Sequence, residues 1–243
     1  MPTCQNPAAT KSAASADPDL DAMSARLEAA TFGRQSPLDR TMRRLIRLSV
    51  LTALSAGEEE IRECAQDALA DGVSPVLLRE AVYQCIPYAG IAKTKNALRP
   101  VNEVLAAAGI ALPLESQATV TDENRFEKGL AVQKSIFGEV IDAMHASAPE
   151  GQKAIMVEHL SAFCFGDIYT RRGLDLKSRE LLTFCIISAL GGCEPQVKSH
   201  VQGNAAVGNE KQMLVDALET CLPLMGFPRT LNALACVNAV MPD

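Results

Sequence analysis

The chain has 243 residues, a mass of 25.9 kDa and a formal net charge of −6, and 48% of its residues are apolar. The acidic balance argues against a nucleic-acid-binding protein, which needs a basic face to neutralise phosphates. Only 4% of the residues are aromatic and none is Trp, which argues against an aromatic-rich β-sandwich or a base-stacking surface and favours closely packed helices.

The N-terminal segment, residues 1–35, is rich in Ala, Ser and Asp. It lacks the apolar stretch of a secretory signal peptide, so we expect a poorly ordered tail on a cytoplasmic protein. Farther along, the chain has no run of about 18 apolar residues, so no membrane span is predicted. We therefore expect neither a membrane nor a nucleic acid as a partner.

The chain contains an internal repeat. Residues 38–104 align with residues 174–240 at a constant offset of 136 positions, without a gap. Self-similarity at one fixed offset indicates two copies of one structural unit. We predict an N-terminal domain over 36–108 and a C-terminal domain over 109–243, which includes the segment that joins the two copies.

Each copy is predicted to be helical. In the second copy, Asp175 is the expected N-cap of a helix over 176–190, and Gly191 with Gly192 ends it. The other helices predicted there span 194–207, 210–222 and 229–240, with breaks at Gly208, at Pro223 with Gly226, and before Pro228. The first copy is predicted to contain the corresponding helices. The joining segment adds amphipathic helices over 125–144 and 152–169, strand-like alternation is absent, and the predicted fold is all-α.

Eight cysteines occur, but no pair has the Cys-x-x-Cys spacing, and the three His are scattered. A disulfide framework and a zinc site are therefore both poorly supported, and no metal is expected. Most of the cysteines lie in apolar helical patterns and are predicted to be small buried side chains in a reducing compartment.

The second copy carries three polar residues that the first copy lacks, namely Glu180, Cys193 and His200. Seven residues are about two helical turns, so Cys193 and His200 are expected on one side of a helix, with Glu180 facing them from the preceding helix. A thiol at a helix N-terminus is biased toward thiolate, and a carboxylate beside an imidazole fixes its tautomer and raises its basicity. This set suits proton transfer or thiol chemistry.

The equivalent residues of the first copy are Arg44, Gly57 and Cys64, so that copy is predicted to be a degenerate, structural one. Arg44 either binds an anionic substrate or, as the pattern favours, is an exposed or ion-paired helix arginine. Each residue of the second copy also has an ordinary alternative: a helix-surface histidine, a small loop cysteine, and a surface carboxylate paired with Lys177 or Arg179.

Two stretches of the chain carry a family resemblance. Residues 125–138 contain R-F-E-K-G-L and I-F-G, and residues 163–175 are F-C-F-G-D-I-Y-T-R-R-G-L-D. Together with Lys198-Ser199-His200 and Gly226-Phe227-Pro228, they are similar to 4-carboxymuconolactone decarboxylases. The whole pattern resembles the superfamily of carboxymuconolactone decarboxylases and alkylhydroperoxidase D-like proteins, and a more divergent copy covers residues 36–105.

The resemblance implies a cofactor-free enzyme but not one particular activity. Alkylhydroperoxidase D-like members use a Glu, a Cys-x-x-Cys pair and a following His. Glu180, Cys193 and His200 match the Glu, the first Cys and the His, whereas Gln196 occupies the position of the second Cys. This departure removes the resolving thiol of the motif, which puts the thiol-peroxidase cycle in doubt.

The first functional hypothesis is therefore a lyase that acts on a small lactone or keto-acid carboxylate. In it, His200 is the general acid/base at the carbon that loses carbon dioxide, Glu180 orients His200, and Cys193 lines the pocket. Guanidinium groups suit bidentate carboxylate binding. The candidate substrate-binding residues are Arg171, Arg172, Arg179 and Gln196.

Two alternatives stay open. One is a thiol-dependent peroxidase or disulfide reductase that uses Cys193, with Cys164 or Cys185 as its partner. The other is a non-catalytic scaffold that keeps the fold. The resemblance also implies an assembly: a chain with two copies is expected to close a pseudo-hexameric ring as a homotrimer, with the small residues around 96–98 and 232–234 at its interfaces.

Overall fold

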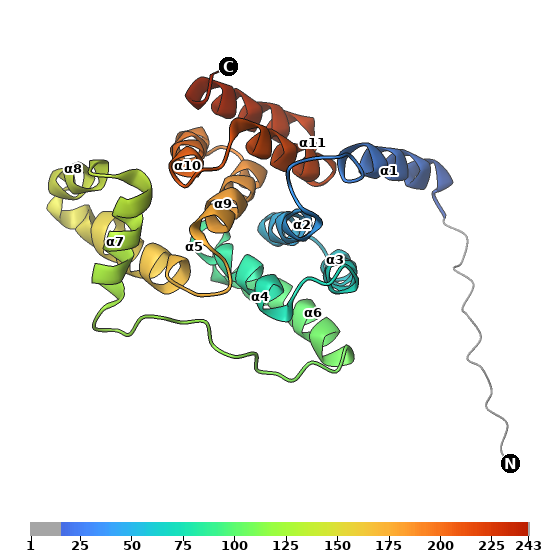
Figure 1. Cartoon of the computed structure of the whole chain (residues 1–243), viewed down its shortest axis with the longest axis horizontal. Coiled ribbons are helices and arrows are strands. Elements are labelled where there is room, and N and C mark those ends of the chain that lie inside the picture. The colour runs from blue at the N-terminus through green and yellow to red at the C-terminus, as the bar shows by residue number, and fades with distance from the viewer. Residues whose placement is uncertain (1–15, 243) are drawn as a thin grey trace, which may run out of the picture.

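The computed structural model of the chain describes residues 16–242, and every regular element in that range is a helix (Figure 1). The predicted all-α fold is confirmed. The elements are α1 (Pro18–Thr31), α2 (Arg40–Leu54), α3 (Glu58–Ala70), α4 (Pro75–Gln84), α5 (Ile86–Ala89), α6 (Ile91–Ala107), α7 (Arg125–Phe137), α8 (Val140–Ser147), η1 (Glu150–Gln152), η2 (Ala154–Tyr169), α9 (Leu176–Leu190), α10 (Glu194–Ala206) and α11 (Lys211–Val240).

The repeat predicted from the sequence recurs in the helices. With the offset of 136 residues, α2 and α3 correspond to α9 and α10, and α4 to α6 correspond to α11. The chain turns at Gly90 in the first unit (φ 91°) and at Gly226 in the second (φ 76°), a conformation that only glycine adopts without strain. The break predicted at Pro223 with Gly226 lies at Gly226, where the backbone leaves the helical conformation, whereas Pro223 lies inside α11.

The two units share one hydrophobic core. Helices α2 and α9 occupy equivalent places in their units and pack against each other, and the core joins side chains such as Leu45 and Ile46 of α2 to Leu182 and Ile186 of α9. The capping of α9 follows the prediction, since the Asp175 carboxylate accepts a hydrogen bond from the backbone N–H of Ser178. The domain boundary predicted after residue 108 falls just beyond the end of α6. The hydrophobic core is nevertheless continuous between the residues before and after this boundary.

Helix α1 corrects the expectation of a disordered tail over residues 1–35. Pro18 begins the helix, acidic residues occupy its first turn, and Glu28 forms a two-pronged ion pair with Arg47 of α2, at 2.8 and 2.9 Å. Because Pro18 and Ala154 are separated by the same 136 positions, α1 is the first unit's equivalent of η2. Residues 1–15 of the predicted tail lie outside the described part of the chain.

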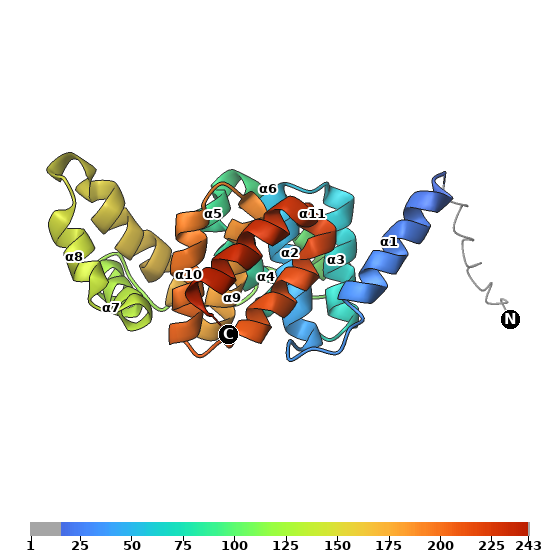
Figure 2. The same ribbon diagram turned by 90° about the horizontal axis from the view of Figure 1, so that it is seen from above.

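The joining segment forms a lobe beside α10. Helices α7 and α8 pack with η2, which is π-helical, and Gly138 splits the single helix predicted over 125–144. A Cβ atom on Gly129 of α7 would collide with the backbone of η2, so the two helices approach at backbone distance. This lobe and α1 lie at opposite ends of the molecule (Figure 2).

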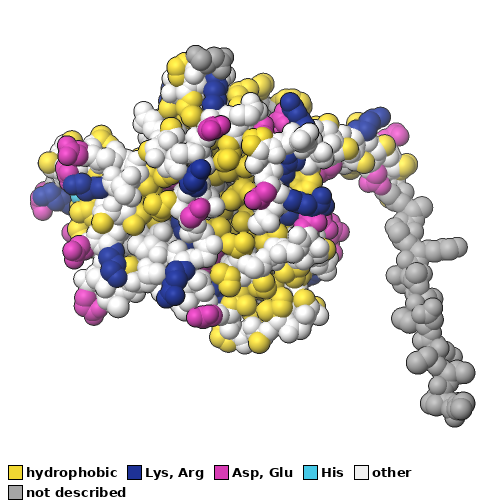
Figure 3. Space-filling view, in the orientation of Figure 1, with side chains coloured by type: hydrophobic (Ala, Val, Ile, Leu, Met, Phe, Trp, Pro, Cys, Tyr) yellow, Lys and Arg dark blue, Asp and Glu magenta, His cyan; other side chains and the backbone are white. Residues whose placement is uncertain are grey.

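The surface of the view in Figure 3 carries charges of both signs, and apolar side chains gather over the region of α4 and α6. Within residues 16–242, no helix is both long enough and apolar enough to cross a membrane.

Candidate active site

Glu180 and His200 form the centre of the site. Glu180 lies on α9 and is fully buried, and His200 lies on α10 and is 8% exposed. The Nδ1 atom of His200 is 2.9 Å from Oε2 of Glu180. Since a carboxylate only accepts hydrogen bonds, Nδ1 is the donor, and Nε2 of the neutral ring is left as the acceptor.

Two small residues of α10 allow the carboxylate and the imidazole to meet. A Cβ atom on Gly203 would collide with the Glu180 carboxylate, so glycine leaves the space that this carboxylate occupies. The side-chain amide of Asn204 donates to the backbone carbonyls of Glu180, at 3.0 Å, and of His200, at 2.7 Å. The bond to Glu180 holds α10 against α9 next to the Glu180–His200 pair.

Tyr169 completes the hydrogen bonding of Glu180, and Tyr88 in turn bonds to Tyr169. The hydroxyl of Tyr169, at the end of η2, donates to Oε1 of Glu180 at 2.8 Å. Because that uses its only proton, the hydroxyls of Tyr88 and Thr183, each 2.9 Å away, donate to Tyr169. Burial raises the pKa of Tyr88 and of Tyr169 well above the ordinary value, so both stay protonated donors.

Tyr88 belongs to α5, so the first unit contributes a side chain to the site of the second. The rings of Tyr88 and Phe137 stand edge-on to the His200 imidazole, each with its centroid 5.6 Å away. The Nε2 atom has no hydrogen-bond partner within the described range, and the His200 side chain is 10% exposed. The site therefore presents one free imidazole nitrogen between two aromatic rings.

Cys193 faces away from this centre. Its thiol is 3.2 Å from the backbone carbonyl of Ile187, and its other neighbours are Glu194 and Cys236. Cys193 is the N-cap of α10 and its backbone is not helical (φ −134°), so the seven-residue helical spacing does not apply to it, and its thiol lies beside Ile187 rather than His200. The expectation of a thiolate is wrong, because burial, with added repulsion from Glu194 and Cys236, raises the pKa of Cys193.

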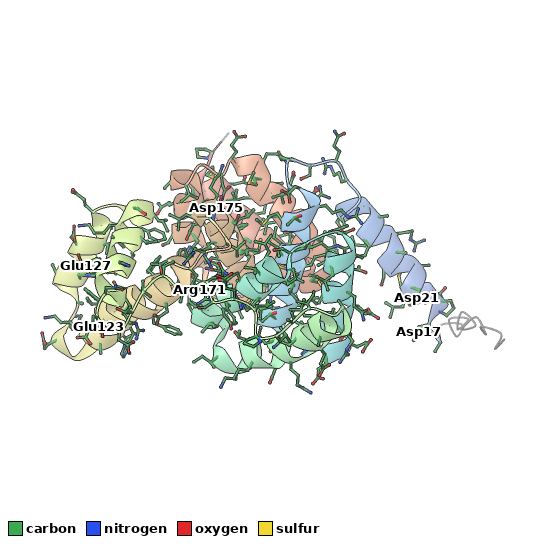
Figure 4. The ribbon with its side chains drawn as sticks, turned by 60° about the horizontal axis from the view of Figure 1, so that its bottom comes forward. Asp17, Asp21, Glu123, Glu127, Arg171 and Asp175 are labelled. Carbon is green, nitrogen blue, oxygen red and sulfur yellow. The ribbon has the colours of Figure 1, made fainter. Side chains whose placement is uncertain are left out.

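Two of the predicted carboxylate-binding arginines are ion-paired inside the protein. Arg171 holds both oxygens of Glu80, at 2.8 and 2.9 Å, and lies where the end of η2 meets the first unit (Figure 4). Arg179 is fully buried and donates to Gln84 at 2.8 Å and to Glu80 at 3.3 Å. Both guanidinium groups therefore link the two units, and this geometry does not support a substrate-binding role for either.

Arg172 and Gln196 have exposed side chains. Their predicted contacts with substrate stay a prediction. In the described part of the chain, no three His, Cys, Asp or Glu side chains are arranged to hold a metal ion.

The equivalent place in the first unit is filled by ion pairs. Arg44, at the position of Glu180, contacts Asp67 at 2.9 Å and Asp71 at 2.6 Å. Its guanidinium lies 4.7 Å from the centroid of the Phe32 ring. Arg44 is thus the ion-paired helix arginine that the pattern favours.

The model of the carboxymuconolactone decarboxylase family matches residues 18–103 and 156–239. The chain belongs to this family. The two matches begin at α1 and near the start of η2, so the family's unit includes the helix that precedes each repeat predicted from the sequence.

One curated relative is a 4-carboxymuconolactone decarboxylase from Acinetobacter baylyi, which is 25% identical over 124 residues. The alignment covers 51% of this chain and 92% of the relative. A match to about half of this chain agrees with a carboxymuconolactone decarboxylase domain that is present twice.

Sequence reasoning missed Tyr88, Phe137 and Thr183 and did not assign Tyr169 a role. The available signal was the rarity of tyrosine: the chain has three, and two of them lie in apolar patterns where a hydroxyl needs a polar partner. The contact between them was not visible, because Tyr88 and its partner Tyr169 are 81 positions apart and meet only when the two units pack.

Proposed function

We propose that this member of the carboxymuconolactone decarboxylase family is a cofactor-free lyase that decarboxylates a small lactone or keto-acid carboxylate. The observation that carries the proposal is the Glu180–His200 pair, with Nδ1 bound to the carboxylate and Nε2 free between Tyr88 and Phe137. The name of the Acinetobacter baylyi relative supports the reaction type.

The chemistry needs one proton at one carbon. Cleavage of the bond to the carboxylate releases carbon dioxide and leaves the electron pair on the adjacent carbon, where a neighbouring carbonyl delocalises it. The protonated His200 ring then delivers the Nε2 proton to that carbon and takes another from solvent. Glu180 stabilises the imidazolium, and the hydroxyl of Tyr169 holds the Glu180 carboxylate in place.

The thiol-peroxidase alternative has less support. Cys193 does not contact His200, its pKa is raised, and the second cysteine of the motif is Gln196. Because Cys193 lies outside the His200 site, a Cys193→Ser variant is a suitable activity control for the lyase.

The test is carbon dioxide release from a panel of lactone acids and keto acids in deuterated water. We expect a substrate that loses carbon dioxide and gains one deuterium at the carbon that carried the carboxylate, with Cys193→Ser as active as the wild type. Turnover without deuterium at that carbon would contradict the proton-transfer role. Absence of turnover on the whole panel would favour the scaffold alternative.

We propose further that three chains form a pseudo-hexameric ring. Ile91 and Phe227 occupy equivalent positions in the two units, directly after Gly90 and Gly226, and are 54% and 61% exposed. Apolar side chains repeated at equivalent exposed positions suit a ring in which the units alternate. We expect light scattering to give three times 25.9 kDa, and Phe227→Lys to lower that mass; a monomeric wild type would refute the ring.

A further inference from the structure

The first unit contains a cavity of about 340 Å³ that shares no residue with the His200 site. Its size falls within the range of about 300–1,000 Å³ that is usual for small-molecule sites. The segment that follows α6 closes one side of the cavity, where it runs back past α4 toward the lobe (Figure 1). The lining includes Arg79 and Tyr83 of α4, Leu98 and Asn102 of α6, and Leu112 and Leu114 of the following segment.

Arg79 brings a buried guanidinium group to the wall of this cavity. The residue is 8% exposed, and its terminal nitrogens donate to the backbone carbonyls of Leu114, at 3.0 Å, and Glu115, at 2.6 Å. Its Nε atom is buried and has no hydrogen-bond partner within residues 16–242. Because a guanidinium group carries five N–H donors, these two bonds hold Arg79 in place and leave it donors for a ligand.

The surroundings of Arg79 hold more positive than negative charge. Glu80 is fully buried and is the common partner of three guanidinium groups, which belong to Arg79, at 3.6 Å, Arg171, at 2.8 Å, and Arg179, at 3.3 Å. The other carboxylate near Arg171 is Asp167, which already pairs with an arginine of α7 at 2.5 Å. Four guanidinium groups thus face two carboxylates in this part of the described chain. Since uncompensated charge in a buried place is costly, a further anion stabilises the cluster.

The rest of the cavity wall is aromatic and aliphatic. The ring of Tyr83 lies between two of these cations, with its centroid 5.8 Å from the guanidinium carbon of Arg79 and 4.9 Å from that of Arg171. Leucine side chains form the opposite wall, and the exposed Asn102 stands at the rim, so the cavity is open to solvent. A guanidinium group beside an apolar wall suits a carboxylate with an apolar body.

The internal repeat shows that this charge is particular to the first unit. At the offset of 136 residues, Val215 stands at the position of Arg79, and Glu219 stands at the position of Tyr83. Glu219 is ion-paired with Arg34 at 2.6 Å. The second unit thus carries an aliphatic and an acidic side chain where the first carries a cation and a ring. The cavity is therefore not a general consequence of the shared helical frame.

We propose that this cavity binds a small organic carboxylate with an apolar body, an aromatic or branched-chain acid. Arg79 donates two parallel N–H bonds to the carboxylate, and the apolar body packs against Leu98 and Leu112. The bound anion supplies negative charge that the arginine cluster lacks. The first unit, which has no counterpart of the Glu180–His200 pair, thereby gains a binding role of its own.

The test is isothermal titration calorimetry of the full chain with benzoate, isovalerate and benzamide. We expect both acids to bind, and benzamide, which keeps the shape of benzoate without its charge, to bind about tenfold more weakly or less. The titration is repeated with His200→Gln, which removes the imidazole of the other site. The affinity for benzoate should be unchanged in that variant.

Two variants locate the bound acid. Asn102→Trp places an indole at the exposed rim and should weaken benzoate binding by about tenfold or more, because it fills the entrance. Asn238→Trp, at the equivalent exposed position of the second unit, is the matched control and should change the affinity by less than about twofold. Tyr83→Glu installs the carboxylate that the second unit has there, and should abolish binding because Arg79 then pairs with it.

Four outcomes would overturn the proposal: no binding of either acid, equal affinities for benzoate and benzamide, loss of benzoate binding in His200→Gln, or unchanged affinity in Asn102→Trp. The comparison of benzoate with benzamide uses the wild type and does not depend on the folding of any variant. The lyase proposal concerns carbon dioxide release at His200 and uses no residue of this cavity, so the failure of either proposal is a separate result.

Discussion

Two equivalent places in the molecule differ in their chemistry. In the second unit, a buried carboxylate, Glu180, holds an imidazole and accepts from a tyrosine. In the first unit, the same helix position carries Arg44, whose guanidinium pairs with Asp67 and Asp71. Asp67 itself stands at the position of Gly203, the glycine that makes room for the Glu180 carboxylate.

The difference extends one helical turn further along. Thr183, which donates to Tyr169 in the second unit, corresponds to Arg47, which is paired with Glu28 in the first. At these positions the first unit pairs its charged side chains with one another, whereas the second leaves one imidazole nitrogen free. The comparison shows how one helical frame holds ion pairs in one copy and a carboxylate–imidazole pair in the other.

The largest expected effect comes from removing the imidazole. His200→Ala should lower kcat for decarboxylation by about 100- to 10,000-fold, because it removes the general acid/base. Cys64→Ala, the equivalent change in the first unit, should keep kcat within about twofold. Equal losses of kcat in the two variants would contradict the functional difference between the two units.

A smaller loss is expected when the carboxylate is neutralised. Glu180→Gln keeps the shape of the side chain but does not stabilise an imidazolium, so kcat should fall about 10- to 100-fold and its pH profile should shift. Glu158→Gln, at an exposed position of η2, is the matched control. A wild-type kcat and an unshifted pH profile in Glu180→Gln would show that Glu180 takes no part in the proton transfer.

Tyr88→Phe tests whether a residue of the first unit contributes to catalysis at the site of the second unit. The variant keeps the ring against His200 and loses the hydroxyl's contacts with Tyr169 and with the Cys164 thiol, so we expect a few-fold lower kcat with an unchanged KM, and a stability loss of about 1 kcal/mol. Tyr83→Phe, on the neighbouring helix α4, is the control. A change in KM alone would point to substrate contact instead.

The smallest effect concerns the ion pairs of the first unit. Hydrogen bonds from Arg40 and Arg44 hold the pKa of Asp71 below its ordinary value. The stabilisation by Asp71 is therefore present at neutral pH and lost as pH falls through the lowered value. The Tm difference between wild type and Asp71→Asn should shrink between about pH 5 and pH 2. Asp142→Asn, which breaks the exposed pair with Lys134, should change Tm little at any pH.

Much of the fold could be predicted because its signals are local. The Asp175 cap, the break at Gly191 and the repeat at one offset can all be found in the sequence. Helix α1 could not, because its acidic first turn is a weak signal and its anchor, the ion pair from Glu28 to Arg47, joins residues 19 positions apart.

The site was predictable only in part for the same reason. The spacing of Glu180 and His200 on adjacent helices pointed to their pairing. The seven-residue spacing did not place Cys193, because this residue is the N-cap of α10 and its backbone is not helical. The roles of Arg171 and Arg179 depended on Glu80, nearly a hundred positions away. Long-range polar partners are set by packing and leave no local pattern.

The most direct test of the central claim is the tautomer of His200, measured by ¹⁵N NMR of the imidazole nitrogens and assigned with His200→Gln. We predict that the neutral ring carries its proton on Nδ1, toward Glu180, and leaves Nε2 unprotonated. We also predict that Glu180→Gln weakens this preference. A neutral ring protonated on Nε2, or a tautomer that Glu180→Gln does not change, would contradict the pairing of Glu180 with Nδ1 of His200.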